Sequence, residues 1–435
     1  MNDPVPQRSA AAAAPRGPLV LALHAAAVFC LGTAHALVYI LPFLARERFG
    51  ATNWQTTVLT ASVPVTQFAA IFWNRLYDRL ATGRYLCVIA LAACLPIALI
   101  GTATNIWIVM GLFFLAALGG AAGVSAMAPL SADLLRTCYD AARHGRVFGV
   151  ICAAQFLATT IAGQLIGMAS DRSPDAFRVY FPAVAGVMGC GLLCVRAISH
   201  KPFWRARGRA PATPGGPWHA PLRDMARVLK EDRRFAGYEA AFMSYGIGWM
   251  ICTALIPAIA TDRLKLNYTQ FAQATIVAYQ ITNVVLLAPM GWVADRVGPM
   301  RLAAGSFAWL TLYPLALIFV PSAGWLGLFA ILYAVGMVGV QLTWTLGPVR
   351  LAGDSSKAPQ YLAIHSTLVG VRGIVAQGLG MILYALTGSF AWPLVLAAAG
   401  FGWASRRMRL LVKEGPDEAH VPRVLLDRTG DVMDM

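Results

Sequence analysis

One arginine, Arg372, stands deep inside a long apolar stretch of this sequence, residues 360–386. If the stretch is a helix, Arg372 lies about 12 residues from its start, which is roughly 18 Å along the axis. A charge at that depth in a membrane costs at least about 2.5 kcal/mol, so such residues usually serve a function. The planar guanidinium can bind a carboxylate or a phosphate through two parallel hydrogen bonds. Gly370 and Gly373 leave room beside it, and His365 lies two turns away on the same face.

Three interpretations of Arg372 stay open. It can bind a substrate or take part in coupling, it can join helices by capping carbonyl groups or pairing with Glu239 or Asp133, or it can face lipid in a misassigned span. No acidic residue lies near the middle of an apolar stretch, since Glu239 and Asp133 are near ends. A coupled proton would therefore need one of these two, or a histidine such as His35, whose ordinary pKa of about 6.5 suits proton exchange.

Other polar side chains recur inside apolar stretches at helical spacing. Thr60 and Gln67 are seven residues apart, and Gln273, Gln280 and Asn283 are placed to share a second face. Polar groups at membrane depth usually face the bundle interior or a wet cavity, although each alone is more often an interhelical hydrogen bond. The candidates for substrate binding are His35, Gln67, Gln155, Gln280, Asn283, Gln341, Trp344, His365 and Arg372.

The composition indicates which kind of protein must position these groups. Of 435 residues, 58% are hydrophobic and only 13% are charged, and the mean hydropathy is +0.61. Soluble proteins carry about 25% charged residues. A soluble enzyme, a fibrous protein and a disordered chain are therefore excluded in favour of an all-α membrane protein. The eight cysteines lie mostly in apolar stretches and form no CxxC pair, so we expect buried thiols and neither a metal site nor a cofactor.

Apolar blocks of about 20 residues, the length that spans a bilayer, occur twelve times, in two sets of six. They lie at 18–43, 54–74, 85–103, 106–132, 147–170, 179–198, 237–260, 270–292, 301–320, 324–348, 360–386 and 390–411. The twelfth is the weakest, because Arg406 and Arg407 arrive early. The expected divisions are an N-terminal tail at 1–17, a first bundle at 18–198, a linker at 199–236, a second bundle at 237–411 and a C-terminal tail at 412–435.

The basic residues predict the orientation of the spans. With the N-terminus inside, only six of the 35 Lys and Arg residues fall in outer loops, one is Arg372, and the other 28 lie in inner loops, tails and the linker. This asymmetry predicts that both termini are cytoplasmic, and it explains the net charge of +15 without nucleic acid. Within the linker, residues 221–230 predict a short amphipathic helix, either at the membrane interface or solvated.

The two sets of six spans repeat. Asp78-Arg79 and Asp295-Arg296 follow the second span of each set, 217 residues apart. At an offset of 213 residues, Arg372 corresponds to Thr159, so its charge is not part of the repeated scaffold. Two six-helix halves joined by a long inner linker are a transporter architecture with the substrate site between the halves.

The loops after these spans carry a recognisable pattern. Residues 291–301 read GWVADRVGPMR, and residues 74–84 read NRLYDRLATGR. They resemble the inner-loop signature of the major facilitator superfamily, G-x-x-x-D-[RK]-x-G-[RK]-x-[RK], in which the first Gly allows close helix packing and the second makes the turn. The copy at 74–84 departs from it, because Asn74 replaces the first Gly and Gly83 comes two residues late.

The resemblance covers residues 18 to 411 and implies twelve transmembrane helices in two pseudo-symmetric six-helix bundles, which rock about a central site. It also implies a gate at the inner face, with Asp78 opposite the start of the eleventh span and Asp133 beside Arg79. The residues expected in this gate are Asp78, Arg79, Gly83, Asp133, Gly291, Asp295, Arg296, Gly298 and Arg301.

We therefore expect a secondary or facilitative transporter of a small organic solute in the plasma or inner membrane. Arg372 would suit an anionic solute. Its partners would be that solute, the lipid bilayer and, if transport is coupled, a proton; no nucleic acid is expected, and the protein would act as a monomer. A multidrug efflux transporter and a non-transporting scaffold or receptor on the same fold remain alternatives. Enzyme activity is not expected, because no nucleophile has an evident base and no metal-ligand spacing occurs.

Overall fold

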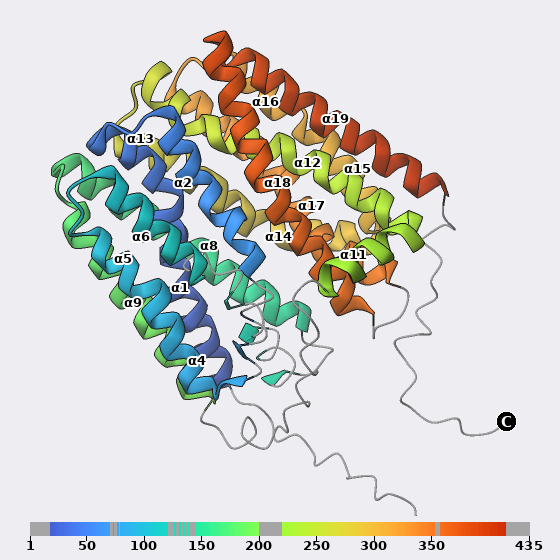
Figure 1. Cartoon of the computed structure of the whole chain (residues 1–435), viewed down its shortest axis with the longest axis horizontal. Coiled ribbons are helices and arrows are strands. Elements are labelled where there is room, and N and C mark those ends of the chain that lie inside the picture. The colour runs from blue at the N-terminus through green and yellow to red at the C-terminus, as the bar shows by residue number, and fades with distance from the viewer. Residues whose placement is uncertain are drawn as a thin grey trace, which may run out of the picture.

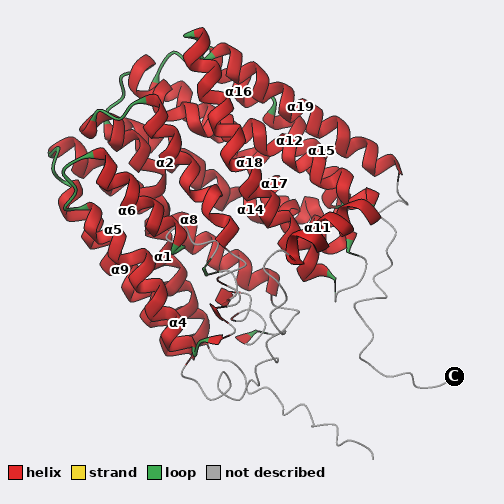
Figure 2. Cartoon of the chain, viewed as in Figure 1, coloured by secondary structure: helices red, strands yellow, loops and turns green. Residues whose placement is uncertain are grey.

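The computed structural model describes residues 18–69, 73, 76–77, 79–120, 126–127, 130–131, 134, 138–139, 144–199, 220–352 and 357–414. This part of the chain is helical and contains no strand (Figure 1, Figure 2). The predicted N-terminal tail at 1–17, residues 415–435 of the predicted C-terminal tail at 412–435, most of the linker and the candidate gate residues Asp78 and Asp133 lie outside the described residues.

The N-terminal half comprises the helices drawn from blue to green in Figure 1. They are α1 (Pro18–Phe49), α2 (Asn53–Thr66) with the 3-10 turn η1 (Gln67–Ala69), α4 (Thr82–Ile89), the π-helical η2 (Ala90–Cys94), α5 (Leu95–Ile100), α6 (Ile106–Leu118), α8 (His144–Arg172) and α9 (Phe177–Ser199).

The C-terminal half follows the linker helix α11 (Ala220–Glu231) and is drawn from yellow-green to red in Figure 1. It contains α12 (Arg233–Ala258), the π-helical η4 (Ile259–Arg263), α13 (Tyr268–Phe271), the π-helical η5 (Ala272–Val277), α14 (Ala278–Val297), α15 (Pro299–Leu310), α16 (Leu312–Ile318), α17 (Ala323–Leu351), α18 (Ala358–Thr387) and α19 (Ala391–Glu414).

Local sequence signals set several of these helix ends. Asp232 accepts a hydrogen bond from the Phe235 N–H, so α12 begins at Arg233, four residues earlier than the apolar block suggested. Asn267 and Gln270 form a capping box at the start of α13. Gly298, with a φ of +82°, ends α14, and the following Pro299 starts α15.

Nine described helical stretches are long and apolar enough to cross a membrane. They are Pro18–Phe49, Thr82–Ile100, Val147–Arg172, Phe177–Ser199, Arg233–Arg263, Tyr268–Val297, Pro299–Ile318, Ala323–Pro348 and Gln360–Thr387. They match nine of the predicted spans. The other three correspond to α2, to the shorter apolar helix α6, and to α19, where the basic residues Arg406, Arg407 and Arg409 occur. The count of twelve and the cytoplasmic termini remain predictions.

The two halves pack in equivalent ways. In the first half α1 contacts α8 and α9, and in the second half α12 contacts α18 and α19. Between the halves, α2 packs against α18, and α8 packs against α13, η5 and α14. Helices α2 and α18 approach closely at Gly373, because a Cβ on this residue would lie 2.8 Å from the Pro64 side chain.

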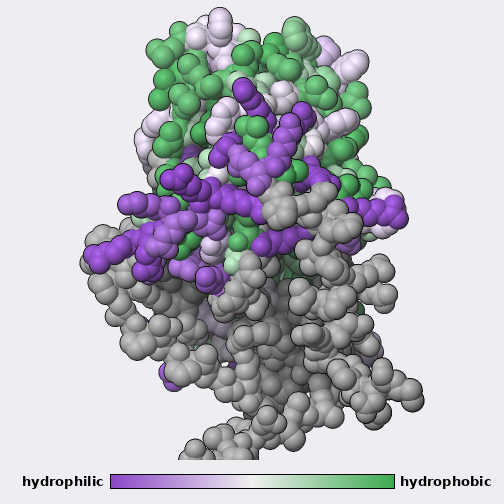
Figure 3. Space-filling view, turned by 90° about the vertical axis from the view of Figure 1, so that its right-hand side faces the viewer, coloured by the Kyte–Doolittle hydropathy of each residue, from purple (hydrophilic) through white to green (hydrophobic). Residues whose placement is uncertain are grey.

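The outer surface of the helices is apolar where a bilayer would cover it. Leu386, Phe319 and Val179 are each more than 70% exposed. Figure 3 shows the face at the right of Figure 1, with hydrophobic residues over its upper part and a belt of hydrophilic residues below them. Large apolar patches on a monomer mark contact with lipid or protein. The wide apolar surface of these helices is expected to contact lipid.

The helix α11 (Ala220–Glu231) lies within the linker. Its apolar side chains Met225, Val228 and Leu229 are half-buried against the bundle, while the basic Arg223, Arg227 and Lys230 are exposed. The apolar side of α11 therefore contacts protein, and its basic side is the one available to headgroups or water.

Candidate functional site

Arg372 lies halfway along α18 and is 3% exposed. Its Nη1 donates a hydrogen bond to the Phe242 carbonyl of α12 at 2.5 Å, and its Cζ lies 5.6 Å from the centre of the Tyr245 ring. Gly246 makes this position possible, because any Cβ there would overlap the guanidinium. The Nε donor has no hydrogen-bond partner among the described residues. Arg372 therefore faces the protein interior and not lipid, and one of its buried donors is left without a hydrogen-bond partner among the described residues.

Glu239 of α12 and His365 of α18 form a buried pair. The His365 Nδ1 lies 2.9 and 3.0 Å from the two carboxylate oxygens, and the side chains are 4% and 1% exposed. Aromatic rings surround the imidazole, with ring-centre distances of 4.9 Å to Trp344 and 5.0 Å to Phe242. Arg372 therefore caps the Phe242 carbonyl, as its interpretation as an interhelical link expects, and Glu239 is bound by another residue. The carboxylate of Glu239 is bound by His365.

Three of the candidates meet around Tyr279 of α14. The Asn283 Nδ2 donates to the Tyr279 carbonyl at 2.7 Å, and the Gln341 Nε2 of α17 donates to the Tyr279 hydroxyl at 3.3 Å. Gln280 lies near Tyr39 of α1, which brings the first half close to this cluster. Gln280 and Asn283 are 3% and 0% exposed, and neither amide oxygen has a partner within the described part of the chain.

Gln273 does not join this cluster. The sequence placed it on one face with Gln280 and Asn283, but it is exposed while they are buried. The reason is the π-helical segment η5, Ala272–Val277, which contains Gln273 and precedes Gln280 and Asn283. A π-helical turn takes more residues than an α-helical turn, so it changes the side on which the preceding residues emerge.

The candidates of the first half lie apart from these groups. The His35 Nε2 and the Gln155 Nε2 are 3.4 Å apart, which joins α1 to α8. Gln67 is half-buried in η1, and Thr60 donates to the Gln377 Oε1 of α18. Gln377, 1% exposed, in turn donates to the Thr60 carbonyl at 3.2 Å. Thr60 therefore joins the two halves, through a partner that the sequence did not single out.

The end of the bundle that carries Arg46 and Asp262, which the charge distribution predicts to face outward, is here called the outer end. Arg46, at the end of α1, binds both carboxylate oxygens of Asp262 at 2.6 Å. It also donates to Thr261 at 2.8 Å and to Asn53 at 2.5 Å. Because Arg46 belongs to the first half and Asp262 to the second, this pair holds the halves together.

A second contact joins the halves at the outer end. Asp171, at the end of α8, accepts hydrogen bonds from the backbone N–H groups of Tyr268 at 2.8 Å and Thr269 at 2.9 Å, and so caps α13. Phe43 of α1 stacks on Phe271 at 4.3 Å. The residues of these two contacts were not predicted from the sequence. Arg46 and Asp262 end equivalent spans of the repeat, 216 residues apart with opposite charges, and that pattern could have found them.

The residues expected in the inner gate are described only in part, since Asp78 and Asp133 fall outside. Arg79, Asp295 and Arg301 are exposed. Arg296 is also exposed, and its Cζ lies 3.5 Å from the centre of the Trp292 ring. Gly298 makes the turn that the resemblance implied, since it has a positive φ between α14 and α15.

Two glycines of the pattern have other roles than expected. Gly291 is not needed for close helix packing, because a Cβ there would meet nothing within 4 Å. Gly83 does not make a turn, since it lies in the first turn of α4. A Cβ on Gly83 would lie 2.9 Å from the Arg196 guanidinium of α9, so its small size makes room for that side chain.

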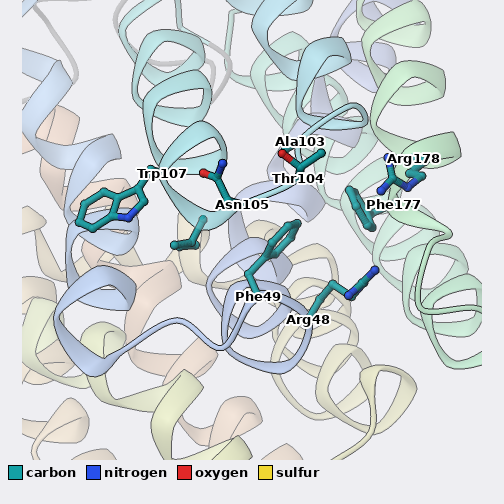
Figure 4. A pocket seen from close by; sticks show the side chains of 9 residues that line it. Arg48, Phe49, Ala103, Thr104, Asn105, Trp107, Phe177 and Arg178 are labelled. Carbon is teal, nitrogen blue, oxygen red and sulfur yellow. The ribbon is translucent and has the colours of Figure 1, made fainter.

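A pocket of about 440 Å³ opens at the outer end of the first half (Figure 4). Among its lining residues are Arg48 and Arg178, whose guanidinium groups lie 2.9 and 3.4 Å from the carboxylate of Asp175. The hydrogen bond from Arg48 holds the pKa of the Asp175 carboxyl below its usual value. The pocket is lined by first-half residues only and is separate from Arg372.

Comparisons with known proteins place this geometry in a family. A model of the major facilitator superfamily matches residues 20–376. The chain belongs to the major facilitator superfamily. It is therefore a multi-pass membrane transporter and not an enzyme. No curated protein matches the sequence.

Solved structures of several other transporters share this fold, although their sequence identity to the chain is low. One is a POT family transporter in complex with a thioalcohol-conjugated peptide, with 12% identity, a TM-score of 0.73, and coverage of 91% of this chain and 96% of that one. Another is the peptide transporter POT in complex with sulfate, with 15% identity, a TM-score of 0.72 and coverage of 94% and 96%. The nucleoside transporter NupG has 13% identity, a TM-score of 0.67 and coverage of 91% and 100%.

Proposed function

We propose that this transporter carries a small organic anion across the plasma or inner membrane, acting as a monomer and by alternating access. The observation that carries the proposal is Arg372, a buried guanidinium at the midpoint of a span with an unfilled Nε donor. A buried charge without a full set of partners is costly. Binding a carboxylate or phosphate in one state of the cycle would offset that cost. Sulfate, also an anion, is bound by one structural neighbour.

The contacts between the halves support an inward-facing state. The Arg46–Asp262 pair, the Asp171 cap on α13 and the Phe43–Phe271 stack all lie at the outer end. These contacts close the path between the halves on that side, and they must break when the outer side opens. They therefore act as the outer gate of an alternating-access cycle, in which a few contacts of moderate strength set the populations of the two states.

We further propose a proton as the coupling ion, carried by Glu239 and His365. With one proton the pair has no net charge, either as carboxylate and imidazolium or as acid and imidazole. Without it the pair is negative and compensates Arg372, on which Glu239 acts electrostatically. An anion at Arg372 would remove that compensation, so the buried charges balance again only when a proton binds with the anion.

Counterflow in proteoliposomes tests the proposal. A panel of labelled organic anions and cations should show uptake of anions only. The Arg372→Ala variant should lose anion uptake. Arg372→Lys keeps the charge but not the planar guanidinium that makes two parallel hydrogen bonds, so it should retain a small part of the uptake. Arg178→Ala, which removes an exposed arginine at the outer pocket, is the matched control and should transport like the wild type. Uptake of cations by the wild-type protein, or full anion transport by a folded Arg372→Ala protein, would overturn the proposal.

A further inference from the structure

The outer pocket of the first half brings two arginines into one cavity. Arg48, near the end of α1, and Arg178, at the start of α9, both line it, and its volume of about 440 Å³ is in the range of cavities that bind small molecules. The two guanidinium groups share one carboxylate oxygen, Asp175 Oδ1, at 2.9 and 3.4 Å. Asp175 is not among the residues that line the pocket, so it holds the guanidinium groups side by side without filling the cavity.

Most N–H groups of these two arginines have no partner in the described part of the chain. Arg48 donates to Asp175 from Nη2 and Arg178 donates from Nε, whereas a guanidinium carries several further donors. The Arg178 Cζ also lies 5.2 Å from the centre of the Phe177 ring, and that ring packs edge-on against Phe49 at 5.4 Å. The side chains are therefore already restrained, which lowers the entropy lost when a ligand binds.

Two helix N-termini add to the positive potential of the pocket. Helix α6 begins at Ile106 and α9 begins at Phe177, and both residues line the cavity. The N-terminus of a helix carries a partial positive charge that favours a negative group. Since two arginines face one aspartate, the pocket also has a net positive charge, and an anionic group suits it.

The pocket lies at the depth where lipid headgroups begin. Arg48 is one residue from the end of the first span, and Phe177 is the first residue of α9. Trp107, which also lines the pocket, is 68% exposed, and Val179, which follows Arg178, is exposed as well. Figure 4 shows Trp107 and Arg178 on opposite sides of the pocket. Tryptophan is enriched at membrane interfaces, so this combination suits a ligand with an anionic head and an apolar tail.

We propose that the outer pocket binds the phosphate of an anionic phospholipid, with the phosphate on Arg48 and Arg178 and an acyl chain beside Trp107. Guanidinium groups match the oxygens of a phosphate. A zwitterionic headgroup binds less tightly, because its cationic end is repelled by the net positive charge of the pocket. The pocket is separate from Arg372 and is lined by first-half residues only, so the lipid is not the transported solute and the proposal is independent of anion transport.

The test measures which lipid contacts Trp107. The full-length protein is reconstituted in phosphatidylcholine vesicles that contain a minor fraction of either phosphatidylglycerol or phosphatidylcholine with brominated acyl chains, which quench tryptophan fluorescence on contact. Subtracting the signal of Trp107→Phe isolates Trp107 from the other tryptophans. Phosphatidylglycerol should bind at Trp107 about five-fold more tightly than phosphatidylcholine, as one net positive charge at a membrane surface predicts. Equal quenching of Trp107 by the two lipids, or no quenching of it at all, would contradict the proposal.

One variant assigns the preference to the pocket. Arg48→Gln keeps a polar side chain but removes the net charge, so it should lose the five-fold preference. Arg172→Gln is the matched control, because Arg172 is exposed at the end of α8 and does not line the pocket; it should keep the preference. If Arg48→Gln keeps the preference, or if Arg172→Gln loses it as well, the general charge of the surface attracts the lipid and the pocket does not.

A soluble phosphate ester separates the lipid from a free anion. Millimolar glycerol 3-phosphate should leave the quenching by brominated phosphatidylglycerol unchanged relative to sodium chloride of equal ionic strength, because it lacks the acyl chains. Release of the quenching would show that the pocket binds a free phosphate ester, and the assignment to lipid would be wrong. If Arg48→Gln does not fold, salt still decides. The wild-type preference should fall at high salt, which screens exposed charges, and a preference that salt does not change would rule out the arginines.

Discussion

The two halves of the molecule cross their helices in the same way but carry different chemistry at the crossing. In the first half, a Cβ on Gly32 of α1 would lie 3.0 Å from the Gln155 carbonyl of α8, and Thr159 donates to the Gly32 carbonyl at 3.0 Å. In the second half, Gly246 of α12 meets α18, and the Arg372 guanidinium fills the space beside it. The same small residue thus allows a hydroxyl bond in one half and a buried charge in the other.

Thr159 and Arg372 differ in how completely their side chains are hydrogen-bonded. The hydroxyl of Thr159 is fully accounted for by bonds to Gly32 and to the Gln155 carbonyl of its own helix. The guanidinium of Arg372 is not fully hydrogen-bonded, since its Nε has no partner among the described residues. The internal repeat has two copies of one packing arrangement, and at these two crossings only the second copy has a buried donor without a partner among the described residues. The comparison predicts that equivalent changes in the two halves will have unequal effects on transport.

The largest effect is expected from Gly246→Ala. The new Cβ would displace the guanidinium, which is the end of a flexible side chain, so the fold should survive while Arg372 leaves its position. Losing a buried charged contact lowers affinity by about 100-fold. Anion counterflow measures this, with thermal unfolding to verify the fold. Gly378→Ala, on α18 where a Cβ meets nothing within 4 Å, is the control and should be neutral. Equal transport by both variants would show that transport does not depend on the space that Gly246 leaves for Arg372.

Proton-driven accumulation of the anion should fall about ten-fold in Glu239→Gln, as the loss of coupling between two binding sites predicts. The variant cannot exchange the coupling proton, but it can still exchange bound substrate across the membrane. Accumulation under an imposed pH gradient should fall, while counterflow at equal pH should continue. A variant that loses both activities equally would show that Glu239 supports structure and not coupling.

The outer gate should respond about five-fold to Asp262→Asn, because a partly buried ion pair contributes about 1 kcal/mol. The amide keeps the shape but loses the charge that binds Arg46, so the outward-open population should rise. Labelling of a cysteine at Thr60, in an otherwise cysteine-free protein, by an impermeant reagent measures that population. The charge exchange Arg46→Asp with Asp262→Arg should restore slow labelling. If it does not, the pair is not the gate.

A smaller effect, about two-fold, is expected from Asp171→Asn in the same assay, because only the interaction of a charge with a helix N-terminus is lost. Asp175→Asn is the matched control, since that carboxylate pairs with Arg48 and Arg178 inside the first half. The lowered pKa of Asp175 means that its pairing is complete at neutral pH and is lost only as the pH falls through that pKa. It should therefore contribute no pH dependence to transport between about pH 5 and 8.

Much of the fold follows from the sequence, because long apolar blocks and capping residues are local signals. Arg372 could be identified for the same reason, as one charge in an apolar stretch. The pairing of Glu239 with His365 could not, since these residues are 126 positions apart and their contact depends on how α12 and α18 rotate against each other. Gln273 shows a second limit, because the π-helical η5 alters a face that regular helical spacing would keep. Arg46 and Asp262 were missed because charges at span ends are usually solvated.

The most direct test of the account is the affinity of the purified protein for an organic carboxylate when each half is changed at the equivalent position. Arg372→Thr gives the second half the side chain that the first half has, and Thr159→Ala removes that side chain from the first half. The account predicts that Arg372→Thr weakens binding by at least about 30-fold and that Thr159→Ala leaves it unchanged. Equal losses in the two variants, or wild-type affinity in a folded Arg372→Thr protein, would contradict it.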